Sequence, residues 1–183
     1  MRKILILGLK LFAIAAVAGL ALGVTNMVTA SAIEEQQIAA ADAARRAVLP
    51  GAESFVEQTA PEGLLSAYAG YDANGALVGK TGAITAKGYG GEIEVTVGVD
   101  ATGAVTGVSV GGTNFSETAG LGARAKEAWF GEQFIGKTSP ISLAKDGGEI
   151  DAITSATITS RAVTGAVNTA VIALGGLTVP TEG

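Results

Sequence analysis

Cysteine and histidine are both absent from the 183 residues of this chain, and aromatic residues make up only 5% of it. Without thiol or imidazole groups, the chain has no cysteine or histidine ligands for zinc or an iron–sulfur cluster, no cysteine nucleophile and no Ser-His-Asp triad. We therefore expect no metal site and no catalytic residue of these kinds. Any redox chemistry must come from a bound organic cofactor.

Basic residues are also scarce, with 12 Lys and Arg against 17 Asp and Glu, so the net charge is -5. An acidic chain without a basic stripe argues against nucleic acid as a partner. The length allows one domain of ordinary size and a short additional segment.

The additional segment is an apolar run at the N-terminus. Residues 4–28 are almost continuously apolar, with Lys10 as the one charged interruption. At about 1.5 Å per helical residue, this run can cross a hydrocarbon core of roughly 30 Å. We interpret residues 1–30 as a single-pass transmembrane anchor in the cell membrane.

Charges on the two sides of the run predict its orientation. Arg2 and Lys3 precede it and Glu34 follows it, so the positive-inside rule places the N-terminus in the cytoplasm and the remainder outside. A cleaved signal peptide is the alternative, because Ala30-Ser31-Ala32 has small residues at cleavage-like spacing. In both interpretations, the rest of the chain lies outside the cytoplasm.

Two further parts follow the anchor. Residues 31–50 are rich in good helix formers and end at Pro50, which predicts a linker helix. Residues 51–183 form the predicted extracytoplasmic domain. Between Tyr68 and Val110 the apolar residues alternate with polar ones, and Asn74-Gly75 marks a tight turn, which predicts half-buried antiparallel strands. The Gly88–Gly91 cluster is interpreted as a turn or bulge.

A helix start is predicted within Asp151–Ser160, where hydroxyl side chains precede an apolar-periodic segment that Gly175 and Gly176 end. Unpaired N–H groups at a helix N-terminus favour an anion such as a phosphate. Arg161, four residues after Thr157, could add a charge-assisted bond. The plainer alternative is an ordinary N-cap formed by the Thr, Ser or Asp oxygens. The whole pattern predicts an α+β fold, with an antiparallel sheet and packed helices.

A second motif, Glu117-Thr118-Ala119-Gly120-Leu121-Gly122, is by itself a glycine-containing loop that opens a short helix. Trp129 and Phe130 follow it and are most easily explained as core residues.

Both motifs resemble those of a known family. The Asp-x-x-Thr-Ser-Ala-Thr-x-Thr-Ser stretch is similar to the flavinylation motif of the FMN-binding domain family, with Ser155 where glycine is usual. The loop resembles the Glu-Thr-Pro-Gly-Leu-Gly loop of the G subunit of the Rnf electron-transport complex, with Ala119 replacing proline. The resemblance runs from the anchor to Leu174.

The resemblance implies an electron carrier with covalent FMN, attached through a phosphoester to Thr157. It also implies roles for neighbouring residues: phosphate contacts from Thr154, Ser155 and Arg161, transferase recognition or loop capping by Asp151, and flavin packing by the loop. Glu117 is either close to the flavin or a structural cap. The predicted cofactor-binding set is Asp151, Thr154, Ser155, Ala156, Thr157, Ser160, Arg161, Glu117, Thr118, Gly120, Leu121 and Gly122.

The implied partners are the other Rnf subunits, both integral-membrane and iron-sulfur or flavin subunits, and a flavin transferase that attaches FMN. The implied complex couples ferredoxin:NAD oxidoreduction to Na+ or H+ translocation, and this chain would have no substrate site of its own. Two alternatives stay open. One is the C subunit of the Na+-translocating NADH:quinone reductase, and the other is an exported, cofactor-free binding or scaffold domain in which Thr157 only caps a helix.

Overall fold

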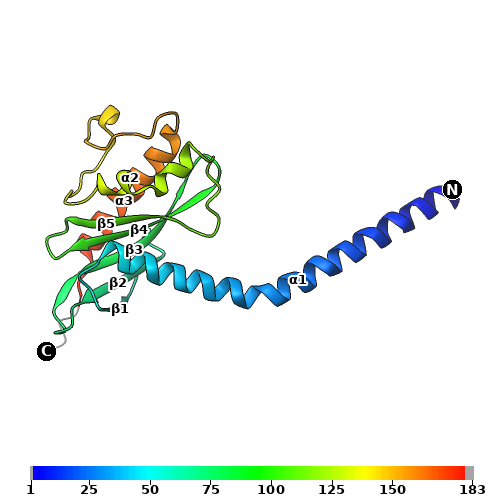
Figure 1. The fold of residues 1–183 in the computed structure, drawn as a ribbon, viewed down its shortest axis with the longest axis horizontal. Coiled ribbons are helices and arrows are strands. Elements are labelled where there is room, and N and C mark those ends of the chain that lie inside the picture. The colour runs from blue at the N-terminus through cyan, green and yellow to red at the C-terminus, as the bar shows by residue number, and fades with distance from the viewer. Residues whose placement is uncertain (1, 180–183) are drawn as a thin grey trace. The chain divides into compact units, whose positions relative to one another are not determined.

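The computed structural model describes residues 2–179 (Figure 1). The chain divides into two compact units, residues 1–41 and 42–183. The elements in chain order are α1 (Arg2–Val48), β1 (Ser54–Gln58), β2 (Ser66–Tyr71), β3 (Leu77–Lys87), β4 (Glu92–Asp100), β5 (Val105–Gly111), the 3-10 helix η1 (Gly122–Lys126), α2 (Ala128–Glu132), the 3-10 helix η2 (Ala144–Asp146) and α3 (Thr157–Gly176).

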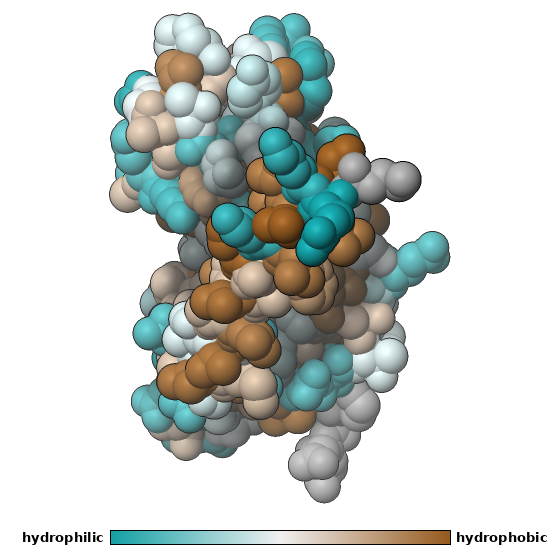
Figure 2. Space-filling view, turned by 90° about the vertical axis from the view of Figure 1, so that its right-hand side faces the viewer, coloured by the Kyte–Doolittle hydropathy of each residue, from teal (hydrophilic) through white to brown (hydrophobic). Residues whose placement is uncertain are grey.

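The first unit is helical throughout its described residues. The predicted anchor and linker lie in one uninterrupted helix, α1, which ends two residues before Pro50. Its large apolar side chains from Ile4 to Val28 are exposed, and Figure 2 shows this helix end on with apolar side chains over much of its surface. Among residues 2–179, α1 is the one helix long and apolar enough to cross a membrane, which supports a single-pass anchor.

The second unit contains a five-stranded antiparallel sheet in the order β1-β2-β3-β4-β5. Each strand pairs with the next in sequence, and the turns at Gly75 and Gly103 adopt positive φ as their turn sequences require. The predicted α+β fold is confirmed. The sequence pattern missed β1, a short edge strand whose side chains are mostly exposed and therefore show no clear alternation.

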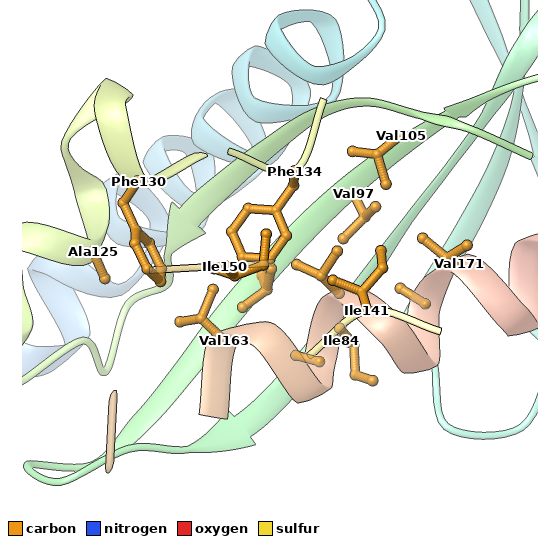
Figure 3. Packing of buried hydrophobic residues seen from close by; sticks show 14 of the residues in the cluster. Ile84, Val97, Val105, Ala125, Phe130, Phe134, Ile141, Ile150, Val163 and Val171 are labelled. Atoms are coloured by element: carbon orange, nitrogen blue, oxygen red, sulfur yellow. The ribbon is translucent and has the colours of Figure 1, made fainter. Parts of the chain in front are cut away.

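One face of the sheet packs against α3. The alternating β4 residues Ile93, Val95, Val97 and Val99 are at most 1% exposed, and each buried valine contributes roughly 1.5–3 kcal/mol. Figure 3 shows this core, where the rings of Phe130 and Phe134 meet edge to face at 5.6 Å. Further members from the loops and α3 are Ile141, Leu143, Ile150, Ile153, Val163, Val167, Ala170, Val171 and Leu174.

The other face of the sheet is partly covered, whereas the alternation predicted half-buried strands. Val48 and Leu49, at the end of α1, lie over glycines of β2 to β5. A Cβ atom on Gly98 would lie 2.3 Å from the Val48 carbonyl oxygen, and one on Gly70 would lie 2.5 Å from a Leu49 methyl carbon. The sheet therefore needs glycine, which has no side chain, at the positions where Val48 and Leu49 pack against its backbone.

Trp129 differs from the core residue that the sequence predicted. Phe130 is fully buried, but Trp129 remains 36% exposed and its indole nitrogen donates to Glu127. The guanidinium of Arg124 lies 5.3 Å from the centre of the indole ring. An indole can cover part of the core while its N–H group faces a polar partner at the surface.

Candidate functional site

The site is centred on the first turn of α3. This helix begins at Thr157, as predicted, and its N-cap residue is Ala156, which forms no side-chain cap. Within residues 2–179, the backbone N–H groups of Thr157, Ile158 and Thr159 have no hydrogen-bond acceptor, whereas Ser160 N–H already bonds to Ala156 at 3.0 Å. The interpretation of the hydroxyl cluster as an ordinary N-cap is therefore wrong, and three N–H donors are free at the positive end of the helix.

Ser155 shapes the chain just before this helix. Its φ of +62° makes it the one non-glycine residue with positive φ among residues 2–179. The next residue, Ala156, donates its N–H to the Ile153 carbonyl at 3.0 Å and closes the turn. A left-handed backbone here explains physically why glycine suits this position of the motif.

Ser160 does not face the site, which corrects its prediction as a cofactor ligand. Its hydroxyl is fully buried, accepts the Ile153 N–H at 2.9 Å and donates to the Ala156 carbonyl at 2.9 Å. Both hydrogen-bonding functions are used to hold the turn in front of α3. Ser160 is therefore a structural residue.

A pocket of about 520 Å³ opens in front of Thr157. It brings together the two motifs predicted from the sequence and a third segment, the turn that carries Tyr89. Its lining residues are Tyr89, Glu117, Thr118, Leu121, Gly122, Ser155, Ala156, Thr157, Ile158 and Thr159. The volume is within the range of roughly 300–1,000 Å³ that is usual for cofactor pockets, and apolar walls with a few polar groups are typical of them.

Glu117 connects the three segments of the pocket. One carboxylate oxygen accepts the N–H of Gly90 at 3.0 Å, and the other accepts the hydroxyl of Thr159 at 2.6 Å. Thr159 is 1% exposed, so the hydroxyl end of this second bond is shielded from water. Of the two roles considered for Glu117, the structure shows the structural bridge and also places the side chain at the pocket.

Besides Ser160, four predicted residues lie outside the lining of this pocket. The Thr154 and Asp151 side chains are exposed, and Gly120 lies at the outer side of the loop with a φ of +77°. The Asp151 backbone N–H donates to the Gln133 side chain at 2.8 Å, which fixes the loop in front of α3.

Arg161 is the fourth of these residues, and its predicted phosphate contact is not what the structure shows. Its guanidinium binds both carboxylate oxygens of Asp146, at 2.9 and 3.0 Å from one nitrogen. The hydrogen bond and charge of Arg161 lower the pKa of Asp146, and the same contact raises the pKa of Arg161. The spacing places Arg161 about one turn after Thr157, but its partner Asp146 lies in η2, and helix periodicity does not reveal this pairing.

Tyr89 is the lining residue that the sequence analysis did not select. The Gly88–Gly91 segment forms the predicted turn, with Gly88 N–H donating to Gly91 at 2.8 Å. Tyr89 at its tip is 73% exposed and borders the pocket. The available signal was a single aromatic residue held between glycines, in a chain with few aromatics.

The family described as "FMN-binding domain" matches residues 88–172. This region extends from the turn of Tyr89 through the Glu117–Gly122 loop to α3, so it contains every residue that lines the pocket. Residues 88–172, which include the pocket, thus match an FMN-binding domain, which supports FMN as the cofactor.

Two relatives match most of the chain. One is the G subunit of the Na(+)-translocating ferredoxin:NAD(+) oxidoreductase complex of Acetobacterium woodii, 44% identical over 186 aligned positions that cover 88% of this chain and 87% of that protein. The other is the G subunit of the ion-translocating oxidoreductase complex of Methanosarcina acetivorans, 33% identical over 86% of this chain and 87% of that protein. The chain therefore belongs to the family of G subunits of ion-translocating oxidoreductase complexes.

A solved structure from Parabacteroides distasonis, the C subunit of Na(+)-translocating NADH-quinone reductase, is also similar, with a TM-score of 0.49 and 20% identity. The match covers 62% of this chain and 64% of that chain. Of the two complex families considered from the sequence, the full-length relatives identify that of the G subunits.

Proposed function

We propose that this protein is a membrane-anchored electron carrier that holds FMN covalently, through a phosphoester on Thr157. The observation that carries the proposal is the position of Thr157 at the uncapped N-terminus of α3, inside the pocket shared with the Glu117–Gly122 loop. The complex would couple ferredoxin:NAD oxidoreduction to movement of Na+ or H+. The name of the Acetobacterium woodii relative states Na+ for its own complex, and that of a G subunit from Clostridium ljungdahlii states protons.

The residues present fit an FMN group. The three free N–H groups of Thr157, Ile158 and Thr159 supply donors for phosphate oxygens, and the helix dipole favours the negative charge. Leu121 and Ile158 supply apolar surface for a ring system, and Tyr89 supplies an aromatic face at the rim. When bound, FMN supplies the transfer of electrons singly or in pairs, which none of the side chains in this chain can perform.

The proposal includes the orientation of the chain in the membrane and the covalent bond between FMN and Thr157. Arg2, Lys3 and Lys10 on the N-terminal side of the apolar run favour a cytoplasmic N-terminus, with the flavin domain on the extracytoplasmic side. A phosphoester would retain the flavin where free FMN cannot be replenished. A separate flavin transferase would make this bond, and the integral-membrane and iron-sulfur or flavin subunits of the complex would exchange electrons with the domain.

The intact mass of the full chain, purified from its native membranes, tests this function. We expect a mass excess equal to FMN minus water in the unsubstituted chain and its loss in Thr157→Ala. Thr169→Ala is the matched control, because this threonine is on the exposed side of α3 and bonds only to the Gly165 carbonyl. No excess in the unsubstituted chain would contradict the proposal and favour the cofactor-free binding domain. An excess retained in Thr157→Ala would contradict the attachment site.

A further inference from the structure

Glu117 is the one charged side chain among the residues that line the pocket, within the described part of the chain. Its two carboxylate oxygens each accept a hydrogen bond, one from Gly90 N–H and one from the Thr159 hydroxyl. A glutamate side chain ordinarily carries a negative charge at neutral pH, and here both of its oxygens receive a hydrogen-bond donor. The pocket therefore has a negative charge in its wall.

This charge is held in a fixed position. A Cβ atom on Gly88 would lie 2.2 Å from one carboxylate oxygen of Glu117, and a Cβ atom on Gly122 would lie 2.1 Å from the other. Both glycines thus form the walls of a niche that any larger residue would fill. With its hydrogen bonds made and its space defined on both sides, the carboxylate cannot turn away from the pocket without breaking both bonds.

We propose that Glu117 lowers the reduction potential of the flavin bound in this pocket; the inference rests on the proposed function. Electrons that enter a flavin ring bring negative charge, and a fixed like charge nearby makes this less favourable. The redox partners are the neighbouring centres of the complex. Glu117 would thus determine how readily the flavin passes an electron on to an acceptor.

Three variants of the full chain separate charge from geometry. Glu117→Gln removes the charge but keeps the shape, because its amide oxygen can accept Gly90 N–H while its NH2 group donates to the Thr159 hydroxyl. Thr159→Val keeps the charge and removes one hydrogen bond. Glu149→Gln is the matched control, because it removes an equal charge from an exposed residue paired with Lys137 outside this pocket.

The measurement is a redox titration of the flavin absorbance at one fixed pH, after intact mass has established FMN loading. We expect Glu117→Gln to favour one-electron reduction about tenfold, which corresponds to an upward shift of about 59 mV. Thr159→Val and Glu149→Gln should shift the potential much less. Amide exchange of Gly90 in the unloaded chain should stay slow in Glu117→Gln and become faster in Thr159→Val.

A Glu117→Gln potential equal to that of Glu149→Gln would overturn the proposal and leave Glu117 as a bridge alone. If Glu117→Gln takes up no FMN, Gly122→Ala replaces it, because its methyl group displaces the carboxylate and should also raise the potential. An unchanged potential in that variant would overturn the proposal equally. Absence of FMN from the unsubstituted chain would instead contradict the proposed function, so the two failures are distinguishable.

Discussion

Thr159 donates its hydroxyl to Glu117 at 2.6 Å, although the two residues are 42 positions apart. The bond joins the first turn of α3 to the glycine-containing loop, and the same carboxylate binds the turn of Tyr89 through Gly90. Neither motif forms the pocket by itself. Their connection through a partly buried hydrogen bond explains how two short patterns in the sequence become one site.

The glycines of the sheet that pack against the end of α1 give the first prediction. Gly98→Ala should destabilise the domain by about 2–4 kcal/mol, because its methyl group would lie 2.3 Å from the Val48 carbonyl oxygen and 2.6 Å from the Thr106 hydroxyl. Thermal unfolding of the detergent-solubilised chain measures the effect. Gly111→Ala in the neighbouring strand β5 is the control, since a Cβ there meets nothing within 4 Å. Equal loss in both variants would contradict the packing argument.

The strained backbone at Ser155 gives the second prediction. Ser155→Gly should stabilise the domain by about 0.5–1 kcal/mol, because glycine adopts a φ of +62° without the Cβ penalty. Ser109→Gly in β5 should instead destabilise it, since glycine weakens an ordinary strand position. Urea unfolding of both variants compares them directly. A destabilising Ser155→Gly would show that the serine hydroxyl makes a contribution larger than the backbone strain.

The buried hydroxyl of Ser160 gives the third prediction. Ser160→Ala should destabilise the domain by about 1–3 kcal/mol, because the Ile153 N–H would lose its acceptor in a buried position. Thr169→Ala removes a similar hydroxyl from an exposed position of the same helix and should change the stability by less than about 0.5 kcal/mol. Denaturant unfolding measures both. Little effect of Ser160→Ala would mean that the turn before α3 does not depend on this bond.

The Asp146–Arg161 pair gives a pH-dependent prediction. Arg161 holds the pKa of Asp146 below its ordinary value of 3.8, so the pair contributes stability that is fully present above pH 3.8. This contribution is lost as the pH falls through the lowered pKa. Asp146→Asn should therefore be less stable than the unsubstituted chain at pH 7, by a small amount because the pair is exposed.

The difference in stability should narrow as the pH falls below 3.8, and added salt at pH 7 should also reduce it. Thermal unfolding at pH 7 and at about pH 3 measures this. Glu127→Gln is a control that removes another exposed carboxylate paired with an arginine, Arg124. A difference for Asp146→Asn that stays constant across this pH range would contradict the role of the charge.

Much of the fold could be predicted from local patterns. The alternation of Ile93, Val95, Val97 and Val99 predicted a strand whose buried face is now seen against α3, and the start of α3 at Thr157 followed from its apolar period. The edge strand β1 was missed because edge strands bury few side chains and so carry little periodic signal. The packing of Val48 and Leu49 on the second face was missed because the glycines beneath them have no side chains and so add nothing to the hydrophobic pattern.

The candidate site divides in the same way. The sequence by itself indicated two of the segments that line the pocket, since hydroxyls before a helix and a glycine-containing loop are local features. Only the tertiary structure decided which side chains reach the pocket. In the structure, the Ser160 side chain is buried and Arg161 pairs with Asp146. Tyr89 and Glu117 both line the pocket. The physical reason is that hydrogen-bond partners and burial depend on residues distant in the chain, and no period within one segment specifies them.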